Sequence, residues 1–122
     1  MSTLVRIGLC ELALGALLGW LVALQVDRPR LVERLGVRSP RRLLSAHLDY
    51  VVMGLILIAV GLAVPGLAGW AQVVLVAGTI VNPTLFLPLA FREEVARTFA
   101  YRTLSVLSFA ATSTGLAAAA LS

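Results

Sequence analysis

The chain has 122 residues, of which 60% are hydrophobic and 13% are charged. A mean hydropathy of +0.98 excludes an ordinary water-soluble globule. All ten basic residues are arginine, and against six acidic residues they give a net charge of +4. This length and composition predict a single all-α membrane domain over residues 1–122.

Four apolar windows have the length that a helix needs to cross a bilayer, which is about 20 residues. They predict helices over about residues 4–26, 43–64, 70–89 and 101–121. Glu11 interrupts the first window and no A-x-A-like site follows it, so we expect a retained helix rather than a cleaved signal peptide. The only cysteine, Cys10, lies in this helix and has no partner for an intrachain disulfide. The fold class is therefore a four-transmembrane-helix bundle, and four short helices favour an oligomer.

The arginines gather around two of the three connections. Six lie between the first two predicted helices and three around the last connection, whereas residues 65–69 carry no charge. By the positive-inside rule, both arginine-rich connections are cytoplasmic and both termini are outside, which fits a bacterial inner membrane. A basic loop can also bind acidic lipid or nucleic acid, but we interpret this one as a topology determinant and expect no nucleic-acid partner.

Small residues and one proline shape the predicted helices. Gly15-x-x-x-Gly19 allows another helix to approach closely, because glycine has no Cβ atom. The fourth helix carries a similar face of Ser105, Ser108, Thr112, Gly115 and Ala119. We interpret both faces as packing surfaces. Pro83 is expected to kink the third helix.

Four polar side chains lie inside the predicted spans: Glu11, His47, Asp49 and Asn82. An ionisable group near the bilayer centre costs about 2.5–3.5 kcal/mol or more, so each needs a reason. His47, Asp49 and Asn82 lie about 6–10 Å beneath the arginine-rich surface and can share one level. Glu11 belongs to the opposite half of the membrane. Asn82 is expected to form a hydrogen bond between helices.

His47, the only histidine, shares a helix face with Tyr50, Val51 and Gly54. Gly54 leaves a gap beside it in which a planar ligand could lie. His47 is either a neutral imidazole hydrogen-bonded across helices or an axial ligand of haem iron. Asp49 points about 200° away around the helix, which argues against a His–Asp catalytic dyad.

The two membrane carboxylates also have alternative interpretations. Glu11 is a buried neutral carboxyl, a partner of Arg6, or a carboxylate of proton- or cation-coupled transport. Asp49 is expected to pair with a loop arginine such as Arg42 or Arg102. No P-loop, G-x-S-x-G, H-E-x-x-H or C-x-x-C motif is present.

Several short motifs resemble those of small four-helix membrane isomerases, the hydroxylaminobenzene mutases and styrene oxide isomerases. The run SAHLD at residues 45–49 is followed by Met53-Gly54, an aliphatic stretch and a proline, as in the second helix of that family. Arg6-Ile7-Gly8 with the later Gly15-x-x-x-Gly19 is similar to the family's first helix. Gly78-Thr79-x-x-Asn82 is similar to its G-T-x-x-N. The likeness covers about the first 90 residues.

The resemblance implies a trimer that holds haem b between neighbouring subunits, with His47 as axial ligand and Asn82 as a polar residue near the pocket. From the shared helix face we expect Gly54 to lie beside the haem, and we take Asn82 and Tyr50 as the candidate catalytic groups. Ferric iron would act as a Lewis acid on an oxygen of a small apolar substrate of the epoxide or hydroxylamine class, which enters from the lipid.

Three positions depart from the family pattern. Met53 stands where the family has an asparagine, and Gly78 and Phe86 stand where styrene oxide isomerase has an aspartate and a tyrosine. Loss of a preorganised donor typically costs about 10²–10³ in rate. Haem binding through His47 is compatible with these changes, whereas the family's route to epoxide isomerisation loses three polar groups.

Three functions therefore stand as hypotheses. The leading one is a haem-binding, isomerase- or mutase-like membrane enzyme. The second is a small multidrug-type proton-coupled transporter that uses Glu11, and the third is an accessory membrane subunit without catalytic activity. The sequence does not identify the substrate.

Overall fold

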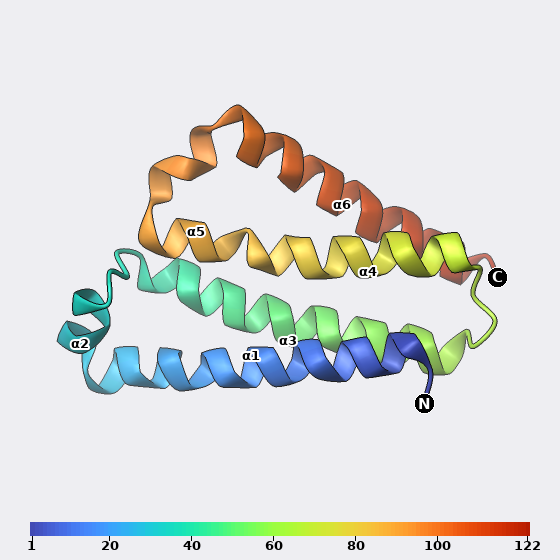
Figure 1. Cartoon of the computed structure of the whole chain (residues 1–122), viewed down its shortest axis with the longest axis horizontal. Helices are drawn as coiled ribbons and strands as arrows, with labels where there is room; N and C mark the ends of the chain where they lie inside the picture. The colour runs from blue at the N-terminus through green and yellow to red at the C-terminus, as the bar shows by residue number, and fades with distance from the viewer.

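The computed structural model describes all 122 residues and contains helices only, as Figure 1 shows. The long helices are α1 (Thr3–Asp27), α3 (Pro40–Ala63), α4 (Gly69–Thr84) and α6 (Phe99–Ala120). Short helices complete the chain: α2 (Pro29–Arg34), α5 (Phe86–Phe91) and the 3-10 helix η1 (Glu93–Arg97). Helices α4 and α5 together make one span, Gly69–Phe91. The predicted class, an all-α membrane protein with four spanning helices, is confirmed.

The four spans have 25, 24, 23 and 22 residues. At about 1.5 Å per residue each is at least about 33 Å long, which exceeds a hydrocarbon core of about 30 Å. The largest difference from the predicted windows is at α3, which begins at Pro40 because proline suits the first helical position. Arg41 and Arg42 therefore belong to the first turn of α3 rather than to the loop.

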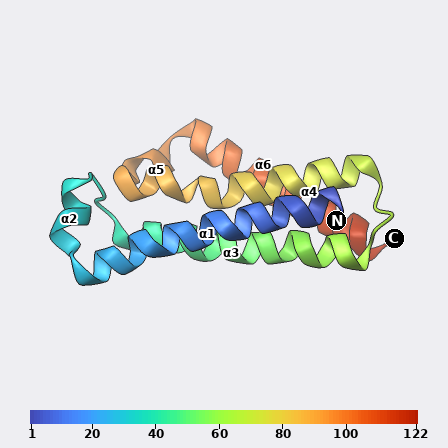
Figure 2. The ribbon, with the colours of Figure 1, turned by 60° about the horizontal axis from the view of Figure 1, so that its bottom comes forward.

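Helix α1 packs along α3 through glycines on both helices (Figures 1 and 2). A Cβ atom added to Gly54 would lie 2.8 Å from the carbonyl oxygen of Gly8 and from the backbone nitrogen of Leu12. The backbone of α1 thus fills the space over Gly54. The gap for a planar ligand that the sequence predicted beside Gly54 does not exist, so that prediction is wrong.

Helix α6 packs on α4 through the predicted face of small residues. Ser108, Thr112, Gly115 and Ala119 are buried there, and Gly115 lies against Leu75 of α4. The first half of α6 tilts away from the other helices in Figure 1. Its outward side chains are largely exposed, and they therefore remain available to lipid or to another chain.

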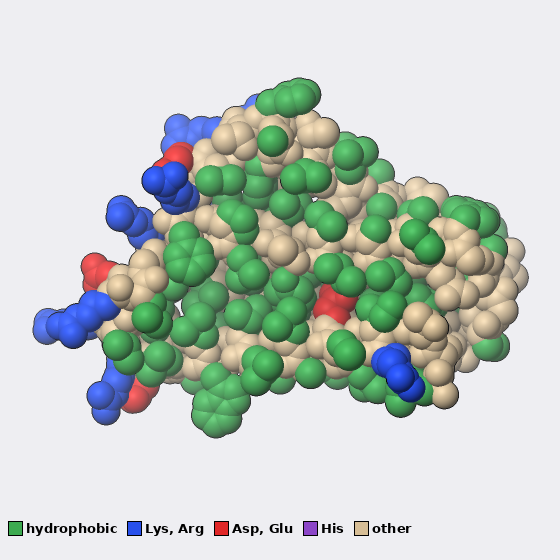
Figure 3. All heavy atoms as spheres, in the orientation of Figure 1, with side chains coloured by type: hydrophobic (Ala, Val, Ile, Leu, Met, Phe, Trp, Pro, Cys, Tyr) green, Lys and Arg blue, Asp and Glu red, His purple; other side chains and the backbone are tan.

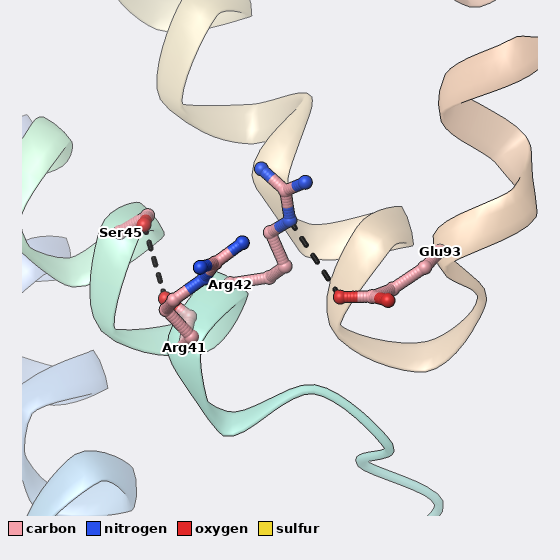
Figure 4. A network of polar contacts seen from close by, with 4 residues as sticks. All are labelled: Arg41, Arg42, Ser45 and Glu93. Carbon is pink, nitrogen blue, oxygen red and sulfur yellow. Dashed lines mark hydrogen bonds and ion pairs between the residues drawn. The ribbon is translucent and has the colours of Figure 1, made fainter.

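Both arginine-rich connections lie at the same end of the bundle. The amides of Arg38 and Ser39 donate to the carbonyl oxygen of Ala90 at 2.7 and 3.0 Å. Arg42 Nε lies 3.8 Å from Glu93 Oε1, as Figure 4 shows. Basic side chains cluster at this end in Figure 3, and both chain termini lie at the other end in Figures 1 and 2.

Two apolar clusters form the core, one toward each end. The cluster near the termini contains Leu4, Leu57, Leu67, Ala71, Leu75 and Ala119. The cluster near the arginine-rich end contains Val32, Val37, Leu43 and Ala90. Along α3, Asp49 and Tyr50 fall between Leu43 and Leu57, so these two polar side chains lie between the two clusters. The third span is interrupted at Leu85, and Pro88 has no N–H to bond the Thr84 carbonyl one turn earlier, whereas the buried Pro83 lies within α4.

Gly54→Ala is expected to lower the free energy of unfolding by about 1–3 kcal/mol, because the added methyl group meets the backbone of α1. Gly69→Ala is the matched control, since a Cβ atom at Gly69 meets nothing within 4 Å. The measurement is the thermal unfolding temperature of both variants in detergent. Equal temperatures for the two variants would contradict the close packing of α1 on α3.

Candidate functional site

The imidazole of His47 is held by the backbone of α1. His47 Nδ1 lies 2.6 Å from the carbonyl oxygen of Gly15. A carbonyl oxygen only accepts, so Nδ1 carries the proton and Nε2 keeps its lone pair in the neutral ring. A Cβ atom on Gly19 would lie 2.9 Å from His47 Cε1. The Gly15-x-x-x-Gly19 motif therefore clears the path by which the ring reaches this carbonyl.

The second ring nitrogen of His47 is free. Nε2 makes no hydrogen bond within the chain, and it is not among the fully enclosed polar atoms. The residue is half-buried. Its helical neighbours Leu44 and Leu48 are 40% and 52% exposed, so the surroundings of the ring on the outer face are apolar. Nε2 can accept a proton or bind a metal from outside the four-helix unit.

The hydrogen bonding of the two His47 ring nitrogens is compatible with a role as haem ligand. A neutral imidazole whose Nδ1–H donates to a carbonyl, with Nε2 free, is a common arrangement of an axial ligand. Five cavities of the four-helix unit are lined by other residues and not by His47, however, and α1 fills the space over Gly54. A haem on Nε2 would therefore have to lie outside the unit, between the surface that α1 and α3 form and a second chain or lipid.

Asn82 joins three helices. Its amide nitrogen donates to Asp49 Oδ2 of α3 at 3.3 Å, and its oxygen accepts from the Ser108 hydroxyl of α6 at 3.1 Å. The hydrogen bond that we expected for Asn82 between helices is present. The expected partner of Asp49 was wrong: the carboxylate bonds to Asn82, whereas Arg42 pairs with Glu93.

The Tyr50 side chain forms its hydrogen bond with the third span and not with a group beside His47. It is 3% exposed, and its hydroxyl lies 2.6 Å from the Thr84 hydroxyl. Thr84 Oγ1 donates its single proton to the carbonyl oxygen of Ile80 at 2.6 Å. The Tyr50 hydroxyl must therefore donate to Thr84, which leaves the phenolic oxygen able only to accept further hydrogen bonds.

Glu11 lies in a pocket of about 290 Å³ between α1, α3 and α4. The polar lining consists of Cys10, Glu11, Tyr50 and Thr84. Glu11 is 5% exposed, and neither carboxyl oxygen has a hydrogen-bond partner. Of the alternatives for Glu11, the pair with Arg6 is not formed: Arg6 is exposed and neither carboxyl oxygen has a partner. Although the backbone of Glu11 belongs to the half of α1 nearer the chain termini, its side chain shares a pocket with Tyr50.

The predicted site residues therefore lie in separate places. His47 bonds to α1, Tyr50 to α4, and Asn82 to Asp49 and Ser108, and no hydrogen bond joins any two of these three candidates. His47 and Tyr50 share a face of α3, but the longer tyrosine side chain reaches across to the third span. Sequence reasoning missed Thr84 as the partner of Tyr50.

The structure also shows what surrounds the three positions that depart from the isomerase pattern. A Cβ atom on Gly78 would lie 2.6 Å from the backbone nitrogen of Thr112. Gly78 is thus a contact between α4 and α6, and an aspartate does not fit there. Met53 and Phe86 are half-buried apolar side chains. None of the three supplies a polar group near His47.

No family model, curated protein or solved structure matches the chain. The resemblance to the membrane isomerases rests on the short motifs of the sequence. The chain also has no group of three or more histidine, cysteine or acidic side chains placed to hold a metal ion. The class that fold and site define is a four-span helical membrane protein with an imidazole free at Nε2 and a buried carboxyl.

A double-mutant cycle with Asn82→Ala and Asp49→Ala is expected to give a coupling free energy of about 0.6–1.7 kcal/mol, the range of hydrogen bonds between membrane helices. The measurement is the free energy of unfolding in detergent. Asn82→Ala combined with Tyr50→Phe is the control, because Tyr50 bonds to Thr84, and these two changes should be additive. Additive effects of Asn82→Ala and Asp49→Ala would contradict the network.

Proposed function

We propose that the chain is a haem-binding, isomerase- or mutase-like membrane protein in which His47 is the axial ligand. The observation that carries the proposal is the hydrogen bond from Nδ1 to the Gly15 carbonyl, which leaves the Nε2 lone pair free. A haem needs only one protein ligand, so the absence of a multi-residue metal cluster does not argue against it. The motif resemblance around residues 45–54 supports the same role.

The haem of this proposal is haem b, and it lies between neighbouring chains of a homo-oligomer, a trimer by the resemblance. The support is steric and chemical: no cavity inside the chain adjoins His47, whereas Leu44 and Leu48 offer an apolar surface beside it. A porphyrin is a large, flat and mostly apolar ring. A second chain or lipid can cover the part of the porphyrin that one chain leaves exposed. The oligomer is therefore part of the binding site in this proposal.

The chemistry proposed is an isomerisation without net redox change. When bound, ferric haem supplies a Lewis acid for an oxygen of a small apolar substrate of the epoxide or hydroxylamine class. The chain orients the imidazole through Gly15 and keeps bulk water away by placing it within the span. Tyr50 and Asn82 bond to other helices, so in this proposal they are positioning residues that hold α3, α4 and α6 together.

The proposed orientation places the arginine-rich end in the cytoplasm and both termini outside, in a bacterial inner membrane. The support is the collection of nearly all arginines at one end of the bundle (Figure 3). His47 lies in α3 seven residues beyond Pro40, which puts the ring about 10 Å inside that surface. The substrate is proposed to reach it from the lipid.

The test is an absorption spectrum of protein purified in detergent and supplied with haem. We expect a Soret band that His47→Ala removes and that added imidazole restores, because the small ligand replaces the missing ring. Since His47 is the only histidine, no other imidazole can take over. Haem should elute with the oligomer in gel filtration and not with the monomer, because one chain encloses no haem-sized cavity.

Asp49→Asn is the matched control, since it changes a polar membrane residue of the same helix whose bond is to Asn82. Its Soret band should equal that of the unchanged protein. A wild-type protein without a Soret band, or a band of equal strength in His47→Ala, contradicts the proposal. With haem bound, conversion of an aryl epoxide or aryl hydroxylamine by the wild type but not by His47→Ala is the expected activity.

A further inference from the structure

The carboxyl group of Glu11 is buried and forms no hydrogen bond. Both oxygens are enclosed and neither has a hydrogen-bond partner, although the residue is only 5% exposed. A buried polar group without a partner costs about 1–3 kcal/mol, and more if it is charged. The structure contains two ion pairs, Arg28 with Asp27 and Arg42 with Glu93, and both lie at the arginine-rich end. Nothing in the chain compensates Glu11.

The pocket in front of Glu11 offers acceptors. The Tyr50 hydroxyl donates to Thr84, and the Thr84 hydroxyl donates to the carbonyl oxygen of Ile80, so neither hydroxyl has a proton left to donate into the pocket. The thiol of Cys10 is a weak donor. When the Glu11 carboxyl is ionised, this wall holds a carboxylate and a phenolic oxygen that only accept, which matches a ligand that brings its own N–H groups and positive charge.

The rest of the pocket is lined by apolar side chains and opens toward the lipid-facing surface of the helices. Ile7, Leu14 and Ile80 line it, and Leu14 and Ile80 are 45% and 39% exposed. Figure 3 shows acidic side-chain atoms surrounded by hydrophobic ones on the face over α1 and α4. A cavity of about 150 Å³ can hold a benzene ring, so about 290 Å³ is enough for a ring with a short substituent.

We propose that this pocket binds a small apolar amine in its protonated form, which enters from the lipid. One oxygen of the Glu11 carboxyl turns from its enclosed position toward the pocket and accepts an ammonium N–H, and the positive charge of the ligand compensates the charge of the ionised carboxylate. The Tyr50 oxygen lies on the same wall and accepts from the ligand, while the apolar side chains hold its hydrocarbon part. The site does not depend on His47 or on haem, so it stands or falls separately from the proposed function.

The test uses N-methylbenzylamine, whose protonated form has two N–H groups, as the probe and calorimetry on the detergent-purified chain. We expect saturable binding that Glu11→Gln weakens by about tenfold or more, the loss of one charge-assisted hydrogen bond. Propylbenzene has the same shape with carbon in place of nitrogen, and it should bind no better to the wild type than to Glu11→Gln. The matched variant Glu33→Gln removes an exposed carboxylate of α2 and should bind the amine as the wild type does.

Cys10 provides a readout that locates the ligand. It is the only cysteine, it is exposed, and it lines the pocket. N-ethylmaleimide should alkylate it more slowly in the presence of the amine, and Glu11→Gln should abolish this protection. Tyr50→Phe is a second variant in case Glu11→Gln fails to fold, and it should weaken binding because it removes the acceptor oxygen and keeps the ring.

The proposal is overturned by any of three results. These are an absence of saturable amine binding, equal affinity of propylbenzene and the amine, or unchanged affinity and Cys10 protection in a folded Glu11→Gln or Tyr50→Phe variant. Loss of the Soret band in His47→Ala with unchanged amine binding would support both proposals and show that the two sites are separate.

Discussion

The close approach of α1 and α3 is the constraint on which the rest of the structure depends. Glycines on both helices bring the backbones so near that a Cβ atom at Gly54 would meet the main chain of α1. The same approach lets the imidazole of His47 reach the carbonyl of Gly15, past Gly19, in the middle of a continuous helix. One packing contact thus decides the tautomer of the only histidine, and with it which nitrogen is free.

The polar side chains of the spans follow a physical rule of membrane proteins. A polar group in hydrocarbon is tolerated where another helix supplies its partner. Asp49, Asn82 and Ser108 satisfy one another across three helices, and Tyr50 and Thr84 do so across two. Glu11 is the exception, since both of its oxygens lack a partner. An unsatisfied carboxyl of this kind is more informative about function than the satisfied groups, because stability alone does not explain it.

Much of the fold could be predicted from the sequence, because apolar windows of about 20 residues and a one-sided arginine distribution report the bilayer directly. The site could not be predicted to the same extent. Depth along a helix showed that Asp49 and Asn82 share a level, but not that they bond to each other rather than to an arginine. The sequence predicts space for a ligand beside Gly54, because the residue pattern of one helix does not show which neighbouring helix fills that space.

Two residues on the same helix face need not have side chains in the same site. His47 and Tyr50 are three residues apart and share a face, yet a tyrosine side chain is long enough to reach the third span while the imidazole stays on α1. Thr84 and Ser108 are unremarkable in the sequence. Their importance follows from the tertiary arrangement, which brings each opposite a buried polar side chain.

The most direct measurement is a ¹⁵N NMR spectrum of the single histidine in detergent-purified protein, before and after addition of haem. The account predicts a neutral ring with the proton on Nδ1 and a bare Nε2, and it predicts that haem perturbs the Nε2 resonance. A proton on Nε2 in the haem-free protein, or an Nε2 resonance that haem leaves unchanged, would contradict it.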